Sequence, residues 1–172
     1  MLTWLFNRSD SRRKASDLYG AVVTLARRPE LYADMGIADT PEGRYEALVL
    51  HLFLVLERLR AAGEDAGGHA QALVETFVTD MDDNMREMGV GDLTVPKKVK
   101  KAAGALYDRV ETYRAALASG SSEELAAVLT RLIPVSDGAT LDADALARDV
   151  KSFAGRLAAH PLPRVLTGEL PA

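Results

Sequence analysis

The chain has no cysteine, which excludes a disulfide scaffold, a thiolate-ligated zinc or iron–sulfur centre and a thiol nucleophile. It has only three histidines, which leaves little for a metal site built from imidazoles. Aromatic residues make up 6% of the 172 residues, and the 13 glycines and seven prolines are scattered, so no low-complexity segment is present. The longest apolar stretch lies between Glu46 and Glu57, far short of the roughly 20 residues of a membrane-spanning helix.

Catalytic and metal-binding motifs are missing as well. No nucleophile elbow, phosphate-binding glycine loop or dinucleotide-binding motif occurs, so we expect a protein that is not an enzyme. The acidic run from Asp80 to Asn84 fails as an EF-hand, because Met85 and Gly91 stand where that loop needs glycine and glutamate. We therefore expect no metal and no cofactor. A net charge of -4 argues against a general nucleic-acid-binding protein, so no specific nucleic-acid partner is expected.

A hydrophobic content of 48% allows a single domain of this length to bury a core. Apolar residues recur at helical spacing, and no segment alternates like a strand. The pattern predicts an all-α fold, a compact single-domain bundle of about six helices. The predicted helices cover residues 10–28, 39–62, 69–88, 96–117, 121–134 and 142–159, with Asp39 expected to cap the second.

The predicted organisation has three parts. Residues 1–14 form an apolar and basic segment, residues 15–160 the helical domain, and residues 161–172 a C-terminal tail. The sequence leaves open whether the tail packs. Within the domain, Met81, Met85 and Met88 recur at helical spacing. We interpret them as core residues, although methionine is also favoured where an apolar surface adapts to partners.

Charge is distributed unevenly along the chain. Residues 1–28 carry about +4, residues 29–93 about -10, residues 94–118 about +4 and residues 119–172 about -2. An acidic middle flanked by basic segments can indicate the chemistry of partners. Pairing of acidic and basic helices inside one fold would explain the same layout, and the sequence leaves both explanations open.

Four lysines gather at the start of the predicted fourth helix: Lys97, Lys98, Lys100 and Lys101. Positive charge at a helix N-terminus is unfavourable by roughly 0.3–1 kcal/mol for each exposed group. The internal candidates for offsetting it are Asp80, Asp82, Asp83 and Glu87. The external candidates are lipid phosphate, ribosomal RNA or an acidic protein.

The N-terminal segment combines apolar and basic residues. Leu2, Trp4 and Phe6 precede Arg12 and Arg13, in the manner of a peripheral membrane contact. The alternative is that the aromatic side chains fold back onto the bundle. The segment lacks the cleavage site and the apolar run of a signal peptide.

His51 lies within the most apolar predicted helix. We interpret it as a core histidine satisfied by one or two hydrogen bonds. The alternative is a haem or small-molecule carrier with a pocket near His51.

Several blocks over roughly residues 15–120 form a collinear pattern. They are DTPEGRYE at 39–46, HLFL at 51–54, ERL at 57–59, QAL at 71–73, DMD at 80–82, MREMGVGDL at 85–93, VPK at 95–97 and YDR at 107–109. Together they resemble the ubiquinol–cytochrome c chaperone family. Asp108 departs from the pattern, since many relatives have glycine there. The resemblance implies a non-enzymatic assembly chaperone for the cytochrome bc1 complex that binds newly made cytochrome b.

The resemblance also suggests roles for particular residues. Cytoplasmic loops of cytochrome b should be rich in lysine and arginine, so an acidic surface is expected to bind them. The candidate client-binding residues are Asp80, Asp82, Asp83, Arg86, Glu87 and Asp92. The candidate membrane or ribosome contacts are Leu2, Trp4, Phe6, Arg12, Arg13, Lys97, Lys98, Lys100 and Lys101. The residues expected to support the fold are Arg44, Glu46, His51, Gly89, Gly91, Tyr107 and Arg109.

Mitochondrial members of the family carry a long leader, whereas here the domain begins almost at Met1. We therefore expect a bacterial, cytoplasmic member that is peripheral to the inner membrane. The mitochondrial members act with a small helical partner protein. A helical scaffold held in a stable hetero-complex is accordingly a further alternative.

Overall fold

Helices make up the regular structure of the part of the chain that the computed structural model describes. That part is the backbone of residues 3–66 and 68–171, with side chains from residue 12 onward. The elements are α1 (Thr3–Ala26), α2 (Pro29–Ala33), α3 (Pro41–Ala62), the 3-10 helix η1 (Gly63–Ala66), α4 (His69–Glu87), α5 (Val95–Ala118), α6 (Ser122–Leu132), α7 (Ala143–Ala159) and α8 (Leu162–Leu166). The predicted all-α fold is confirmed, and the six long helices correspond in order to the six that were predicted. α1 differs most, since it begins at Thr3 and not near residue 10.

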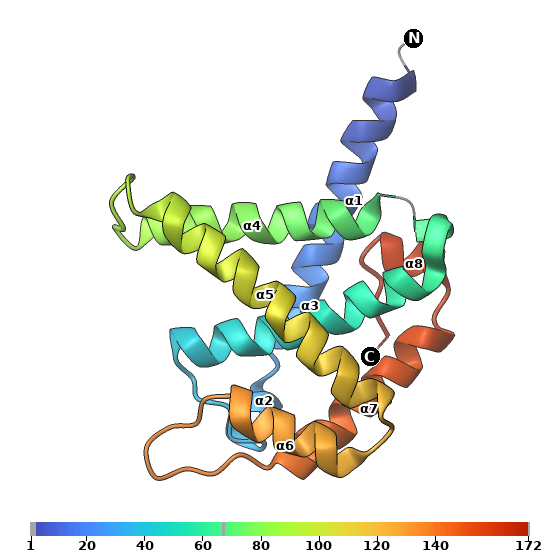
Figure 1. Ribbon diagram of the computed structural model, residues 1–172. Helices are drawn as coiled ribbons and strands as arrows, with labels where there is room; N and C mark the ends of the chain where they lie inside the picture. The colour runs from blue at the N-terminus through green and yellow to red at the C-terminus, as the bar shows by residue number, and fades with distance from the viewer. Residues whose placement is uncertain (1–2, 67, 172) are drawn as a thin grey trace.

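α3 is the central helix, and α1, α5 and α7 pack around it (Figure 1). Its middle is apolar on nearly every side, and every residue from Val49 to Val55 is buried. A helix that is hydrophobic all round is stable only inside a core. The Phe53 ring lies 5.5 Å from that of Tyr113 on α5, which ties the central helix to its neighbour.

The cap of α3 differs from the prediction. The hydroxyl of Thr40, not the carboxylate of Asp39, accepts the hydrogen bond from the backbone N–H of Gly43, at 3.1 Å. Asp39 instead accepts a hydrogen bond from Nε of Arg44 at 2.7 Å. A threonine followed by proline at the first helical position meets the same requirements one residue later, so the assignment of Asp39 as the cap was wrong.

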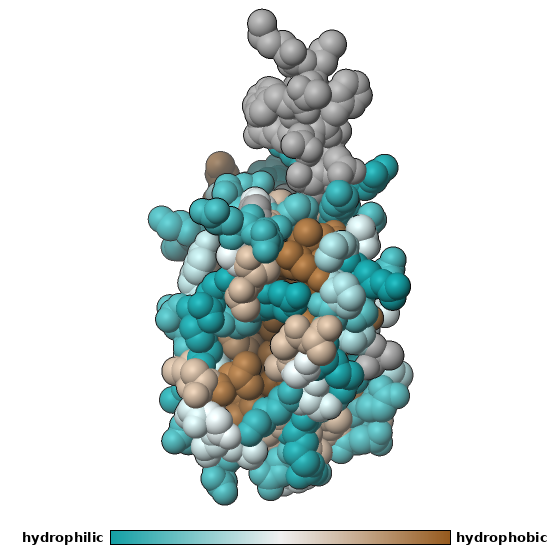
Figure 2. All heavy atoms as spheres, turned by 90° about the vertical axis from the view of Figure 1, so that its right-hand side faces the viewer, coloured by the Kyte–Doolittle hydropathy of each residue, from teal (hydrophilic) through white to brown (hydrophobic). Residues whose placement is uncertain are grey.

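The C-terminal tail packs against the first helix. α8 contacts α1, and Val165 is fully buried there. Gly168 adopts a φ of +82°, and a Cβ atom at this position would lie 2.8 Å from the carbonyl oxygen of Asp17. Hydrophilic side chains predominate on the side of the molecule with α8, with smaller apolar areas between them (Figure 2). This end of the chain is therefore part of the packed structure.

α4 and α5 form a helical hairpin whose turn lies at the edge of the molecule (Figure 1). Gly89 ends α4 with a φ of +77°. The N–H of Gly89 donates to the carbonyl of Arg86 and the N–H of Val90 to that of Met85, both at 3.0 Å. These two bonds form a Schellman motif, as the predicted left-handed glycine requires. Within the described residues, no helix has the length and hydropathy to cross a membrane.

Candidate partner-binding surface

A groove of about 610 Å³ lies between α1, the start of α3 and the second half of α4. α1 contributes Val23 and Ala26 and α3 contributes Tyr45 and Leu48. The remaining lining residues are Arg27, Asp39, Thr40, Pro41, Arg44, Asp80, Met81, Asn84, Met85 and Met88. The lining therefore combines apolar side chains with charged ones.

Three of the five methionines of the chain line this groove. Met81, Met85 and Met88 lie on one face of α4, because residues four and seven apart share a helix face. Met81 packs against the core, but Met88 has 68% of its surface exposed. The interpretation of all three as core residues was thus wrong for Met88. These unbranched thioether side chains suit a surface that adapts to a partner.

Several polar side chains of the groove are held by ion pairs or hydrogen bonds within the chain. Asp39 pairs with Arg44 at 2.7 Å, and both side chains are 61% exposed. The hydroxyl of Tyr19 donates to a carboxylate oxygen of Asp80 at 2.7 Å. Burial, and then the Asp80 carboxylate, raise the pKa of Tyr19, so that this hydroxyl stays protonated. Asp80 is thereby fixed on the α1 side of the groove.

The predicted acidic surface is divided between two sides of α4. Asp82 accepts a hydrogen bond from Arg86 at 2.6 Å, and the same guanidinium reaches Asp92 at 2.6 Å. Arg86 thus offsets part of their charge and ties the turn to the helix end. Asp83 is exposed and lines a second groove with Arg12 and Tyr19 of α1. Glu87 is also exposed.

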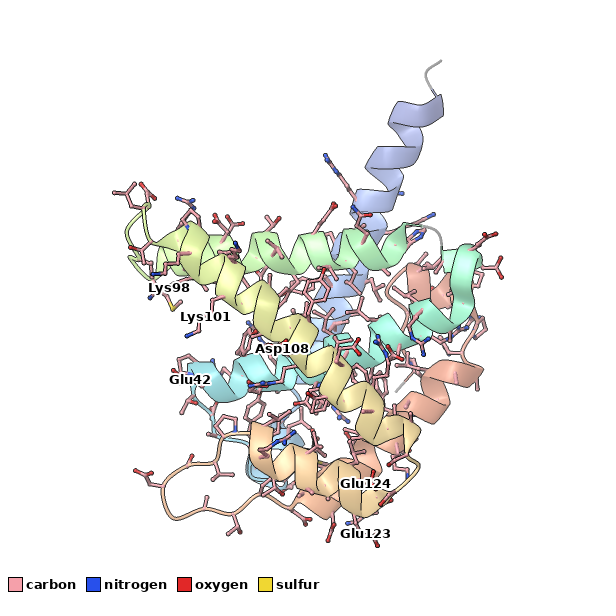
Figure 3. The ribbon with its side chains drawn as sticks, viewed as in Figure 1. Glu42, Lys98, Lys101, Asp108, Glu123 and Glu124 are labelled. Atoms are coloured by element: carbon pink, nitrogen blue, oxygen red, sulfur yellow. The ribbon has the colours of Figure 1, made fainter. Side chains whose placement is uncertain are left out.

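The four lysines at the start of α5 are exposed and do not pair with these carboxylates. Among the described residues, no hydrogen bond or ion pair joins Lys97, Lys98, Lys100 or Lys101 to another side chain. Direct ion pairs with the carboxylates of α4 therefore do not offset the charge of these lysines. Lys98 and Lys101 extend from the first turns of α5, close to the hairpin turn (Figure 3). Nothing in the first turn of α5 is acidic, and Thr94 makes no side-chain cap.

The predicted N-terminal contact lies only partly within the described structure. Leu2 and the side chains of Trp4 and Phe6 fall outside the described residues. Arg12 and Arg13 are exposed on α1, where Arg12 lines the groove that contains Asp83.

Comparisons with known proteins identify the family to which the chain belongs. The family model described as ubiquinol-cytochrome C chaperone matches residues 33–172, which include α3, α4 and α5. The chain belongs to the ubiquinol–cytochrome c chaperone family. The crystal structure of the Cbp3 homologue from Brucella abortus has 35% sequence identity and a TM-score of 0.82. That alignment covers 99% of this chain and 95% of the Brucella chain. No curated protein is detectably similar to the chain.

Glu46 and Arg109, two residues of the blocks that resemble this family, form an ion pair between α3 and α5. Arg109 on α5 donates to both carboxylate oxygens of Glu46 on α3, at 2.9 Å from Nε and 2.7 Å from a terminal nitrogen. The side chains are only 27% and 10% exposed. The hydrogen bonds to Glu46 raise the pKa of Arg109. The pair therefore joins the start of α3, which lines the groove, to α5.

His51 is enclosed within the chaperone domain. Its Nδ1 lies 2.7 Å from the carbonyl oxygen of Ala47, one turn earlier on α3. The Phe153 ring is 6.2 Å away, and 3% of the residue is exposed. Burial lowers the pKa of His51 to about 4, so the imidazole is neutral at physiological pH. These surroundings are those of a hydrogen-bonded core histidine.

The remaining motif residues lie in different settings. Gly91 has open space around its α-carbon, and its carbonyl accepts hydrogen bonds from the N–H groups of Thr94 and Val95. Tyr107 is 62% exposed on α5. Gly43, in the first motif, is the position where sterics most clearly require glycine. A Cβ atom there would lie 1.9 Å from the carbonyl oxygen of Ala38.

Sequence reasoning missed two residues of the groove and its surroundings. Tyr45 lines the groove and donates a hydrogen bond from its hydroxyl to the carbonyl of Ala102, which links α3 to α5. Leu93, at the hairpin turn, is 99% exposed. The sequence could have pointed to this exposure, because Leu93 lies in a short linker between two predicted helices, close to four lysines.

Proposed function

We propose that this protein is a non-enzymatic assembly chaperone for the cytochrome bc1 complex, and that its client is newly made cytochrome b. Membership of the ubiquinol–cytochrome c chaperone family supports this role. The observation that carries the proposal to particular residues is the methionine-lined groove between α1, α3 and α4.

The groove has the chemistry of a site for an apolar helix. Flexible methionines in its lining can pack against side chains of varied shape, as in other grooves that accept amphipathic helices. Membrane proteins carry an excess of lysine and arginine in the cytoplasmic segments beside their helices. Asp83, beside the groove, provides a carboxylate for such a segment. The proposed occupant is therefore an apolar segment of cytochrome b with a basic flank.

The division of the acidic surface sharpens this proposal. Asp82 and Asp92 already bind Arg86, so their carboxylates are less available to a client. Asp83 and Glu87 are exposed. We place the electrostatic contribution to client binding mainly on Asp83 and Glu87, with Asp82, Arg86 and Asp92 holding the hairpin turn. The protein would work at the cytoplasmic face of the inner membrane, where such a client emerges.

Affinity isolation of the tagged chain from native membranes tests this function. Unassembled cytochrome b should co-purify with the chain, and a strain that lacks the chain should lose ubiquinol–cytochrome c reductase while keeping cytochrome c oxidase. A chain that captures no cytochrome b, in a strain whose reductase is unaffected by its loss, would contradict the assignment. Stable isolation of a small helical protein instead would identify a hetero-complex as the principal role.

The groove is tested by a double substitution, Met85→Ser and Met88→Ser. Loss of two thioether side chains from an apolar contact should weaken client capture by at least tenfold, since burying one methionine side chain is worth about 1.5–3 kcal/mol and about 1.4 kcal/mol corresponds to a tenfold change. The matched control is Val135→Ser, which alters a side chain that is 41% exposed in the loop between α6 and α7. Equal capture by the two variants would exclude the groove as the client site.

A further inference from the structure

The hairpin turn between α4 and α5 presents an apolar residue to solvent from a well-fixed backbone. The carbonyl of Gly91 accepts hydrogen bonds from the N–H groups of Thr94 at 2.8 Å and Val95 at 3.2 Å. Val95 is completely buried, and Arg86 holds Asp92 at 2.6 Å. Between these attachments the Leu93 side chain is 99% exposed. A leucine held outward in this way buries no apolar surface and so adds no hydrophobic stabilisation to the fold of its own chain.

Among the described residues, two of the large hydrophobic side chains that are exposed lie at or beside this turn. The described residues include four large hydrophobic side chains that are exposed, and Met88 and Leu93 are two of them. The other two, Tyr107 and Val135, lie elsewhere, on α5 and in the loop before α7.

Positive charge adjoins the exposed leucine. Lys97, Lys98, Lys100 and Lys101 follow Leu93 within eight residues and are all exposed. Within the described part of the chain these lysines have no hydrogen-bond or ion-pair partner. Figure 3 shows Lys98 and Lys101 at the same edge of the molecule as the turn. An apolar side chain bordered by cations matches the layered chemistry of an anionic membrane surface, with acyl chains beneath phosphates.

We propose that the α4–α5 turn and the first turns of α5 dock on an anionic lipid bilayer. Leu93 enters the boundary between headgroups and acyl chains, and the lysines contact lipid phosphates. Nucleic acid would bind the lysines through its phosphates. Such phosphate contacts are polar and would leave the exposed Leu93 side chain in water. The observations favour lipid over RNA for this reason. The proposal does not depend on the identity of the client.

Co-sedimentation of the full chain with vesicles tests the proposal. The probe is phosphatidylcholine containing about 30% phosphatidylglycerol, with pure phosphatidylcholine for comparison. Binding should occur on the anionic vesicles, fall as salt rises from about 0.1 M to about 0.5 M, and be weak on the neutral ones. Leu93→Gln should weaken binding by about tenfold, and the double variant Lys97→Gln and Lys98→Gln by tenfold or more.

Matched controls separate this surface from general effects of charge and hydropathy. Val135→Gln replaces an exposed apolar residue in the loop before α7, and the double variant Arg131→Gln and Arg148→Gln removes two exposed cations elsewhere. Both controls should bind vesicles like the unmodified chain. All the altered positions are exposed, and thermal unfolding should confirm that every variant remains folded.

Three outcomes would overturn the proposal. The first is the absence of binding to anionic vesicles, and the second is binding that is equal in the turn variants and the controls. The third is binding to a short RNA that is lost with the lysines and unaffected by Leu93→Gln, with no binding to vesicles. That third result would identify a nucleic-acid contact in place of a membrane contact.

Discussion

The Glu46–Arg109 pair connects α3 to α5 through a bidentate contact with little exposure to solvent. Glu46→Gln removes the charge that balances Arg109 and leaves a half-buried guanidinium. Breaking one partner of a buried pair is costly, and partial exposure of Arg109 reduces that cost. We expect the variant to lose about 2 kcal/mol of unfolding free energy, measured by urea denaturation.

The control is Asp39→Asn, which breaks the Asp39–Arg44 pair at a site where both side chains are 61% exposed. Exposed pairs contribute little, because water screens them and the side chains lose freedom on pairing. Its denaturation midpoint should stay close to that of the unmodified chain. Equal destabilisation by the two variants would show that burial does not distinguish the pairs.

His51 makes stability depend on pH. Burial lowers its pKa to about 4, from about 6.5 in an exposed histidine, so the unfolded chain takes up the proton first. The contribution of the neutral imidazole is complete above about pH 6.5 and is lost as the pH falls toward 4. Between about pH 7 and about pH 4.5 this should remove roughly 2–3 kcal/mol of unfolding free energy.

The comparison for this pH effect is His51→Gln, which cannot take up a proton at this position. The variant should lose less stability than the unmodified chain over the same pH range, in parallel urea titrations. Identical pH profiles would mean that His51 has the same pKa in the folded and the unfolded chain, which would contradict the effect of burial on its pKa.

At the scale of the helices, the entry into α3 depends on close backbone contact at Gly43. The Cβ of Gly43→Ala would overlap the carbonyl oxygen of Ala38, at 1.9 Å. Because the obstacle is backbone, the loop or the helix must move, and overpacking of this kind costs 1–3 kcal/mol or more, so we expect about 2 kcal/mol at least. Thermal unfolding measures the loss.

Gly20→Ala provides the matched substitution within α1, where an added Cβ meets nothing within 4 Å. Alanine should stabilise that helix by about 0.5–1 kcal/mol, through its higher helix propensity. A lower melting temperature for both variants would count against the steric argument at Gly43.

Local signals predicted the long helices well, because capping and periodicity act over a few residues. Ser121 and Asp142 cap α6 and α7, as the side-chain hydrogen bonds to Glu124 and Ala145 show. The cap of α3 was assigned one residue early, since Asp39 and Thr40 are both good caps. The packing of α8 was left open because it depends on a distant surface of α1.

At the scale of the whole molecule, the sequence showed the uneven distribution of charge and the methionine face, but not which neighbouring groups each of them contacts. Periodicity places Met81, Met85 and Met88 on one face of α4 and does not say whether a neighbouring helix covers that face. Only the tertiary structure shows α1 and α3 leaving a groove beside it. Likewise, Arg86 is within reach of two carboxylates through the turn, so they do not pair with the lysines of α5.

These arrangements give the molecule two neighbouring surfaces, the groove between α1, α3 and α4 and the α4–α5 turn with the first turns of α5. The groove beside α4 is proposed to hold the client, and the turn with Leu93 and the lysines is proposed to contact the membrane. The α3 and α4 sides of the groove and the whole α4–α5 turn lie within the region that the family model matches, whereas the α1 side of the groove precedes it. A chaperone built in this way would bring a half-made membrane protein and the bilayer surface together.

Site-specific photo-crosslinking of newly made cytochrome b tests the central claim most directly. Benzoylphenylalanine in place of Met88, which lines the groove and is 68% exposed, should form an adduct with unassembled cytochrome b in cells. The same probe in place of Val135, in the loop before α7, should not. Adducts of equal yield from the two positions, or none from position 88 in a chain that still co-purifies cytochrome b, would contradict the account.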